Sequence, residues 1–162
     1  MNTSYSQDYK RIEWDILGAA SLMPTSNDLG NTLGFYSELR LNLNNKLSLG
    51  LNYKWQFFGE MFNDPIRGFG VTNASAITAD YYFFNKRNRR AFVGLGVGFY
   101  DNAATTQAGD PIGGTGPGLI PRIGYDLRFL RIMASFNHTF EDDFPNYLEL
   151  SLGFTIGGKF KS

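Results

Sequence analysis

Hydrophobic and polar residues alternate one for one along most of the chain, most clearly from Leu47 onward. Between Leu47 and Phe57, leucine or an aromatic residue takes every odd position, and small or polar residues take the even positions. A period of two predicts a β-strand with one apolar and one polar face. Alternation alone leaves open which face lies inside. A soluble barrel would bury the leucines, whereas a membrane barrel would turn them toward lipid.

The same pattern recurs along the chain and predicts eight strands, with no convincing helix. The predicted strands are residues 11–22, 33–43, 47–57, 74–84, 91–101, 119–129, 130–140 and 147–160. Strands of globular proteins average about 5 or 6 residues, and most of these are roughly twice that length. A tilted strand that crosses a bilayer needs about 9 to 11 residues. Strand length therefore favours the membrane barrel.

The connections between the predicted strands alternate between long and short. Long connections are expected at 23–32, 58–73, 102–118 and 141–146, and short ones at 44–46, 85–90 and 128–131. Outer-membrane barrels have long external loops and short periplasmic turns. An even number of strands places both ends of the barrel chain on the side of the short turns.

The polar faces of the predicted strands carry charges of both signs. If these faces line the interior, the charges must be paired, because an isolated buried charge costs several kcal/mol or more. An eight-stranded barrel leaves an interior just wide enough for side chains. We therefore predict a filled lumen, in which Lys54 pairs with a carboxylate such as Asp80 or Glu38. The predicted polar network comprises Glu13, Asp15, Glu38, Arg40, Lys54, Asp80, Arg122, Asp126, Arg128 and Glu149.

The apolar faces sort their aromatic residues toward the strand ends, with leucines nearer the middle. Two aromatic belts around an aliphatic band are typical of a barrel in a bilayer, because Trp and Tyr are favourable at the headgroup level. The alternative is a soluble, lipocalin-like ligand-binding barrel, which would hold its apolar faces inside. The predicted belts comprise Trp14, Trp55, Phe57, Tyr81, Phe83, Tyr125, Phe129, Phe136 and Phe160.

Composition narrows the function classes. Fifteen basic and fifteen acidic residues give a formal net charge of zero, which gives no reason to expect a nucleic-acid partner. The chain contains no cysteine, so disulfides and thiolate metal sites are excluded. No apolar run approaches the roughly 18 residues of a membrane-spanning helix. The first eleven residues, MNTSYSQDYKR, lack the apolar segment of a signal peptide. The protein is therefore either cytosolic or a mature chain whose signal has been removed.

The last predicted strand, YLELSLGFTIGGKF from Tyr147 to Phe160, alternates throughout and ends on an aromatic residue. It resembles the terminal assembly signal of small eight-stranded outer-membrane proteins of the OmpX/OmpA-barrel type, although Lys161 and Ser162 follow the aromatic. The resemblance covers all eight predicted strands and suggests a Bacteroidetes-like source. It implies an all-β, eight-stranded antiparallel up-and-down transmembrane β-barrel at residues 11–160. Residues 1–10 would form a periplasmic tail and 161–162 a C-terminal tail, with the protein in the bacterial outer membrane.

Catalytic chemistry is not indicated. The only histidine, His138, lies on an apolar face. A lipid A deacylase would need a serine two residues further on, where this chain has Phe140, and the nucleophile–base arrangement is therefore incomplete. We predict no enzymatic activity and no cofactor, with a lipid A-modifying enzyme as an alternative.

The expected role is structural, or it is interaction at the surface, or membership of an envelope complex. The expected partners are the lipid bilayer, lipopolysaccharide and a protein bound through the long loops. The alternative is transport of a small apolar molecule through a lateral opening. Pro121, with Pro117 and Gly118, would weaken pairing between the fifth and sixth predicted strands, because proline cannot donate to a strand ladder. The competing explanation is that the sixth strand simply starts later.

Overall fold

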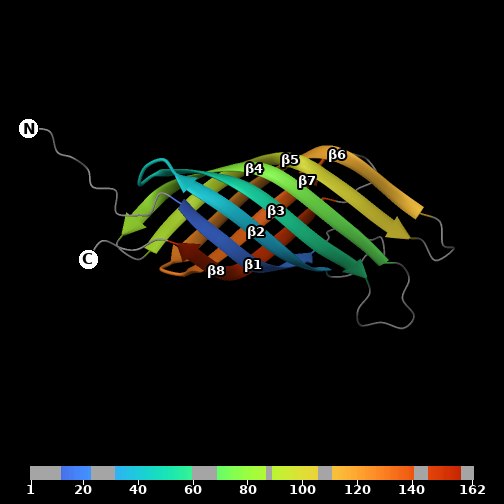
Figure 1. Ribbon diagram of the computed structural model, residues 1–162, viewed down its shortest axis with the longest axis horizontal. Helices are drawn as coiled ribbons and strands as arrows, with labels where there is room; N and C mark the ends of the chain where they lie inside the picture. The colour runs from blue at the N-terminus through green and yellow to red at the C-terminus, as the bar shows by residue number, and fades with distance from the viewer. Residues whose placement is uncertain are drawn as a thin grey trace, which may run out of the picture.

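The computed structural model describes residues 12–22, 32–59, 69–86, 89–105, 111–140 and 146–157. These residues form eight strands around one axis, shown in Figure 1. The strands are β1 (Ile12–Leu22), β2 (Thr32–Asn42), β3 (Leu47–Gly59), β4 (Phe69–Lys86), β5 (Arg89–Thr105), β6 (Pro111–Leu127), β7 (Leu130–Thr139) and β8 (Tyr147–Gly157). The predicted tails and Phe160 lie outside the described residues.

Each strand pairs antiparallel with its neighbours in sequence, and β8 pairs with β1 to close the barrel. Closure leaves no complete strand as a free sheet edge. The predicted eight-stranded antiparallel up-and-down barrel is therefore confirmed. We call one end the short-turn rim, where β1 begins, β8 ends and the turns 43–46 and 128–129 lie (Figure 1). The opposite end is the long-loop rim.

Three strands extend at least four residues further than predicted at one end. β4 begins at Phe69 rather than at 74, β5 continues to Thr105, and β6 begins at Pro111 rather than at 119. The glycines and prolines of β6 suggested a loop, but β5 offers a partner for every residue out to the Thr105–Pro111 pair. Pairing along the neighbouring strand has overridden a composition that disfavours strands. The bounds predicted for the connections at 58–73 and 102–118 were therefore wrong.

Burial alternates along the strands, and the polar residues face inward. On β2, Glu38 and Arg40 are fully buried, whereas Leu39 between them is 51% exposed. Large apolar side chains of every strand lie exposed on the outer surface. A lipocalin-like barrel needs the opposite arrangement, and that alternative is contradicted. The barrel encloses a charged interior and presents an apolar exterior.

The lumen as the candidate functional site

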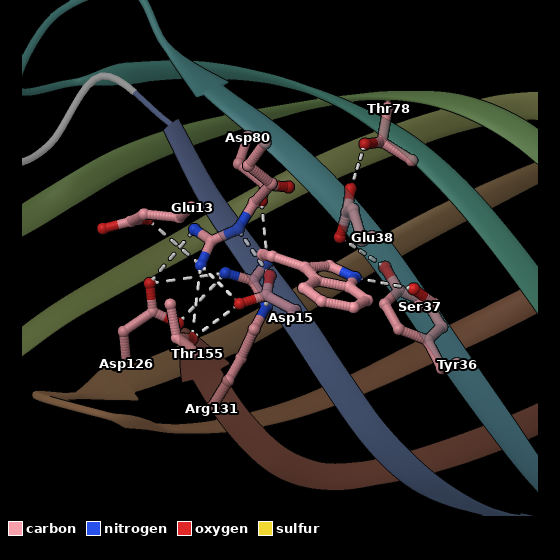
Figure 2. A network of polar contacts seen from close by, with 12 residues as sticks. Glu13, Asp15, Tyr36, Ser37, Glu38, Thr78, Asp80, Asp126, Arg131 and Thr155 are labelled. Carbon is pink, nitrogen blue, oxygen red and sulfur yellow. Dashed lines mark hydrogen bonds and ion pairs between the residues drawn. The ribbon is translucent and has the colours of Figure 1, made fainter. Parts of the chain in front are cut away.

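Arg40 of β2 is the centre of the polar network nearest the short-turn rim. Its guanidinium contacts both carboxylate oxygens of Asp15 and lies 3.2 Å from Glu13 and 3.4 Å from Asp126. It also donates to the hydroxyl of Tyr82. Figure 2 shows Glu13 and Asp15 of β1 and Asp126 of β6 converging on one point in the lumen. One cation thus joins β1, β4 and β6 across the lumen.

Arg131 and Arg90 complete this layer. Arg131 of β7 donates to Asp126 at 3.0 Å and to Asp80 at 2.7 Å, and it lies over the ring of Phe92. Arg90 of β5 donates to Glu13 at 2.8 Å and pairs with Asp126 at 2.9 Å. Neither arginine was among the predicted lumen residues. Their contacts make the layer a continuous network rather than a set of separate pairs.

Arg122 of β6 makes the most complete set of contacts in the middle of the barrel. Its two terminal nitrogens donate to the two oxygens of Glu38, at 2.8 and 3.0 Å. Its Nε donates to Asp80 at 2.7 Å, and Nη1 also donates to the Tyr36 hydroxyl at 2.6 Å. A bidentate arginine–carboxylate pair fixes geometry as well as charge. Thr78 donates to the same Glu38 carboxylate (Figure 2).

A second polar layer lies toward the long-loop rim and is built around Glu149 of β8. Lys54 Nζ lies 2.9 Å from the Glu149 carboxylate and donates to Asn137 at 2.8 Å. Gln56 donates to both Glu149 and Ser21. The predicted partners of Lys54, Asp80 and Glu38, were wrong, because those carboxylates are bound by arginines. The actual partner lies on a strand that is not adjacent to β3.

Apolar side chains separate the two layers. Leu17 lies between Asp15 and Ser21 along β1, and Met133 lies between Arg131 and Ser135 along β7. Both belong to a buried cluster with Tyr36, Tyr82 and Phe92. The described lumen therefore holds six carboxylates and five cations, each in at least one ion pair, interleaved with apolar side chains. Such an interior is filled rather than channel-like.

Nine of the ten predicted network residues lie inside the barrel, and Arg128 does not. Arg128 is exposed in the β6–β7 turn and has a φ of 54°. A two-residue turn between antiparallel strands requires such a left-handed backbone, which removes the residue from strand alternation. Arg131 takes the inward place instead. The alternation of the strand could have identified Arg131, because it lies an even number of residues from Ser135 and Asn137 and therefore on their inward face. Arg90 shares the inward face of β5 with Phe92 in the same way.

The described residues of the predicted aromatic belts lie on the outer surface. Trp14, Trp55, Tyr81, Phe83, Phe129 and Phe136 are exposed there, and Phe57 and Tyr125 are half-buried. Trp14, Tyr81, Phe83, Tyr125 and Phe129 are near the short-turn rim, whereas Trp55, Phe57 and Phe136 are nearer the long-loop rim. The belt position predicted for Phe160 falls outside the described residues.

The predicted weakness beside Pro117, Gly118 and Pro121 is corrected by the strand register. β5 and β6 pair without interruption past all three residues, so neither a β5–β6 opening nor a later start of β6 occurs. The carbonyl of Pro117 accepts from Phe140, beyond β7. Because the nitrogen and carbonyl of one strand residue point to the same side, Pro117 and Pro121 both direct their nitrogens away from β5.

The interruption lies instead between β6 and β7. Pairing stops after Leu119–His138 and resumes at Arg122–Ser135 in the same register. The missing positions include Pro121, whose nitrogen cannot donate. Proline has therefore removed ladder contacts without shifting the strands.

His138 is held by an amide rather than by catalytic partners. Its Nδ1 lies 2.8 Å from the Asn146 side-chain oxygen, which also accepts from the backbone of Thr139, and its ring packs edge-on against Phe140. Across the described ranges, no group of three or more metal-ligating side chains occurs. No helix in the described part of the chain is long and apolar enough to cross a bilayer.

Comparison with known proteins identifies the class of fold. No protein-family model and no curated protein matches the chain. Solved structures match nearly its whole length. Neisserial surface protein A aligns with a TM-score of 0.70 and 13% identity over 92% of this chain and 98% of that protein.

Two further structures agree. The N-terminal β-barrel domain of Pseudomonas aeruginosa OprF gives a TM-score of 0.60 and 12% identity over 91% of this chain and 99% of that one. Ail, the attachment invasion locus protein of Yersinia pestis, was solved with the heparin analogue sucrose octasulfate. It gives a TM-score of 0.57 and 17% identity over 93% of this chain and 100% of that one. The chain therefore has the fold of the small eight-stranded transmembrane barrels of the OmpX/OmpA type.

Proposed function

We propose that this protein is an integral bacterial outer-membrane barrel with a closed lumen, which acts in envelope structure or in interaction at the cell surface. The observation that carries the proposal is the combination of a paired, buried charge network inside and an apolar surface outside. Only a surrounding of lipid makes that apolar exterior favourable. The short-turn rim then faces the periplasm.

The chemistry of the long connections supports contact with basic groups or with cations. The segments 23–31, 60–68, 106–110 and 141–145 contain seven acidic residues and one basic residue, Arg67. This charge favours a basic protein surface, or divalent cations that link the loops to lipopolysaccharide. The Ail structure holds a polyanion. The acidic excess of these four segments disfavours a similar ligand there. Membership of an outer-membrane complex would use the same surface.

Transport through the lumen is the competing function, and planar-bilayer recording separates the two. Protein refolded from urea into detergent should give a heat-modifiable gel band, which establishes a folded barrel. Inserted in a planar bilayer, that fraction should show no steady ion conductance, because paired side chains fill the lumen. Steady conductance from the folded fraction would contradict the closed lumen. A chain that folds as a soluble monomer without detergent would contradict the membrane location.

A further inference from the structure

A groove of about 1080 Å³ crosses the outer surface of the barrel. Its lining residues follow the direction of the cross-strand pairs rather than the direction of a strand. Strands of a barrel tilt by about 35–45° from the barrel axis, so a row across them climbs from one rim toward the other. One such row of paired residues is Phe35, Gly18, Leu152, Ile132, Tyr125 and Ala91.

Small residues at intervals hollow this surface. Gly18 and Ala91 stand in the row, and Ala20 and Ala134 stand in the adjacent row of the same groove. The neighbouring positions carry leucine, isoleucine or aromatic side chains. The four small residues project less far than these neighbours, so a depression forms above them. The end of the groove nearest the short-turn rim lies at Ala91, close to the start of β5.

A β-bulge shapes the end of the groove nearest the short-turn rim. The β4–β5 register shifts between Tyr82 and Phe84, so that Phe84 pairs with Ala91. Paired residues share a face of the sheet, and Phe84 therefore lies on the outer surface beside Ala91. Phe83 is 58% exposed and also lines the groove. The notch over Ala91 is thus bounded by aromatic rings from β4 and by Tyr125 from β6.

Cations lie immediately beyond the notch. Arg89 precedes Ala91 by two residues on the same outer face, and it pairs with Leu127, which directly precedes Arg128. Arg89 and Arg128 are both exposed, and within the described residues neither takes part in an ion pair. Lys86 pairs with Arg89 across the β4–β5 ladder.

The described part of the short-turn rim exposes charge of one sign. Its exposed charged side chains within the described ranges are Lys46, Lys86, Arg89 and Arg128, while the nearby acids Glu13 and Asp126 are buried. Among the described residues of this rim, an anion at the membrane surface meets exposed cations and no exposed carboxylate. Charge complementarity therefore favours a negatively charged headgroup.

We propose that the short-turn rim binds an anionic phospholipid. The lipid phosphate lies against Arg89 and Arg128, and one acyl chain lies in the notch over Ala91, between Phe83 and Tyr125. The proposal rests on the proposed membrane location, which places this rim at the periplasmic leaflet. It adds a headgroup preference that an apolar barrel surface alone does not provide.

Native mass spectrometry of the folded protein in detergent tests the headgroup preference. The probe is an equal mixture of phosphatidylglycerol and phosphatidylcholine with identical acyl chains. A basic residue near an anionic membrane surface contributes about fivefold in affinity, so phosphatidylglycerol adducts should exceed phosphatidylcholine adducts by at least that factor. Arg89→Gln with Arg128→Gln should bring the ratio close to one. Lys46→Gln, which removes one charge of the same rim at a residue that does not line the groove, should leave the ratio unchanged.

A second pair of variants tests the notch. Ala91→Phe fills it and should reduce retention of both lipids, whereas Ala79→Phe, an outer-face alanine of β4 that does not line the groove, should not. Excess glycerol phosphate, which lacks acyl chains, should fail to displace the lipid.

Three results would overturn the lipid site: equal adducts of the two lipids, an equal loss of selectivity in Lys46→Gln, or displacement by glycerol phosphate. These outcomes require a heat-modifiable, folded barrel. Failure to form that band would instead contradict the proposed function, and the two failures are therefore distinguishable.

Discussion

At the scale of single residues, the lumen is limited by space as well as by charge. Gly94 faces Arg122 and Asp80, and a Cβ built on it would lie 2.1 Å from the Asp80 carboxylate and 2.8 Å from the Ala79 carbonyl. Gly50 has the same relation to Glu38, at 2.2 Å. Glycine normally weakens a strand interior. At these positions it leaves room for the long charged side chains that cross the barrel.

Gly94→Ala should therefore destabilise the barrel although alanine is the better strand residue. Displacing Asp80 from Arg122 breaks a buried pair, for which we expect a loss of about 3 kcal/mol in unfolding free energy. Gly18→Ala is the control, because the nearest atom to its Cβ is the Leu152 carbonyl at 3.9 Å. It should stabilise by about 0.5–1 kcal/mol. Urea titration in detergent measures both, and equal effects of the two substitutions would refute the steric account.

The sequence predicts the inner and outer faces well because alternation is a local property. It did not predict the partners inside the lumen. Lys54 meets Glu149, and Arg40 meets Asp15 and Asp126, because barrel closure and strand tilt decide which side chains face each other. The wrong prediction for Arg128 has a different cause. Its positive φ lies in a turn, and a turn cannot be located from the alternation of apolar and polar residues alone. The groove depends on which residues of neighbouring strands lie side by side, and the alternation pattern within a single strand does not determine that register.

At the scale of elements, the described β6–β7 ladder is interrupted within its length. Its pairs stop at Leu119 and resume at Arg122, and β7 ends at Thr139 while β6 extends back to Pro111. The neighbouring β5–β6 ladder is continuous over the same stretch. The β6–β7 ladder therefore lacks a backbone hydrogen bond at Pro121 because proline has no N–H. The strand register is the same on both sides of the gap and is not the cause.

Pro121→Val should restore a donor directed at β7. A hydrogen bond contributes about 0.5–1.5 kcal/mol net, which should raise the urea midpoint and slow amide exchange around Phe136. Pro111→Val is the matched control, because its nitrogen also points away from β5, but β7 ends at Thr139, opposite Gly118, well short of this position. Both substitutions lose the rigidity of proline in the unfolded chain, so the difference between them isolates the new bond. Equal midpoints would show that the β6–β7 ladder is not limited by the missing donor.

At the scale of the whole molecule, the proposed bilayer predicts that stability depends on height along the barrel. Leu95 lies within β5 and is 50% exposed, and Leu43 lies in the β2–β3 turn and is 49% exposed. Exposure therefore does not distinguish the two residues, whereas a bilayer does. An arginine on the lipid-facing surface costs about 2–4 kcal/mol at the midplane and about 0–1 kcal/mol near the interface.

Leu95→Arg should accordingly lower the unfolding free energy in phospholipid vesicles far more than Leu43→Arg. Guanidinium titration of both variants against the unsubstituted chain measures the difference. The same pair compared in a short-chain detergent micelle, where water reaches the whole surface more easily, should show a smaller gap. If the two substitutions cost the same in vesicles, the aliphatic band is not at the centre of a bilayer. The proposed orientation of the aromatic residues at its two borders would then fail as well.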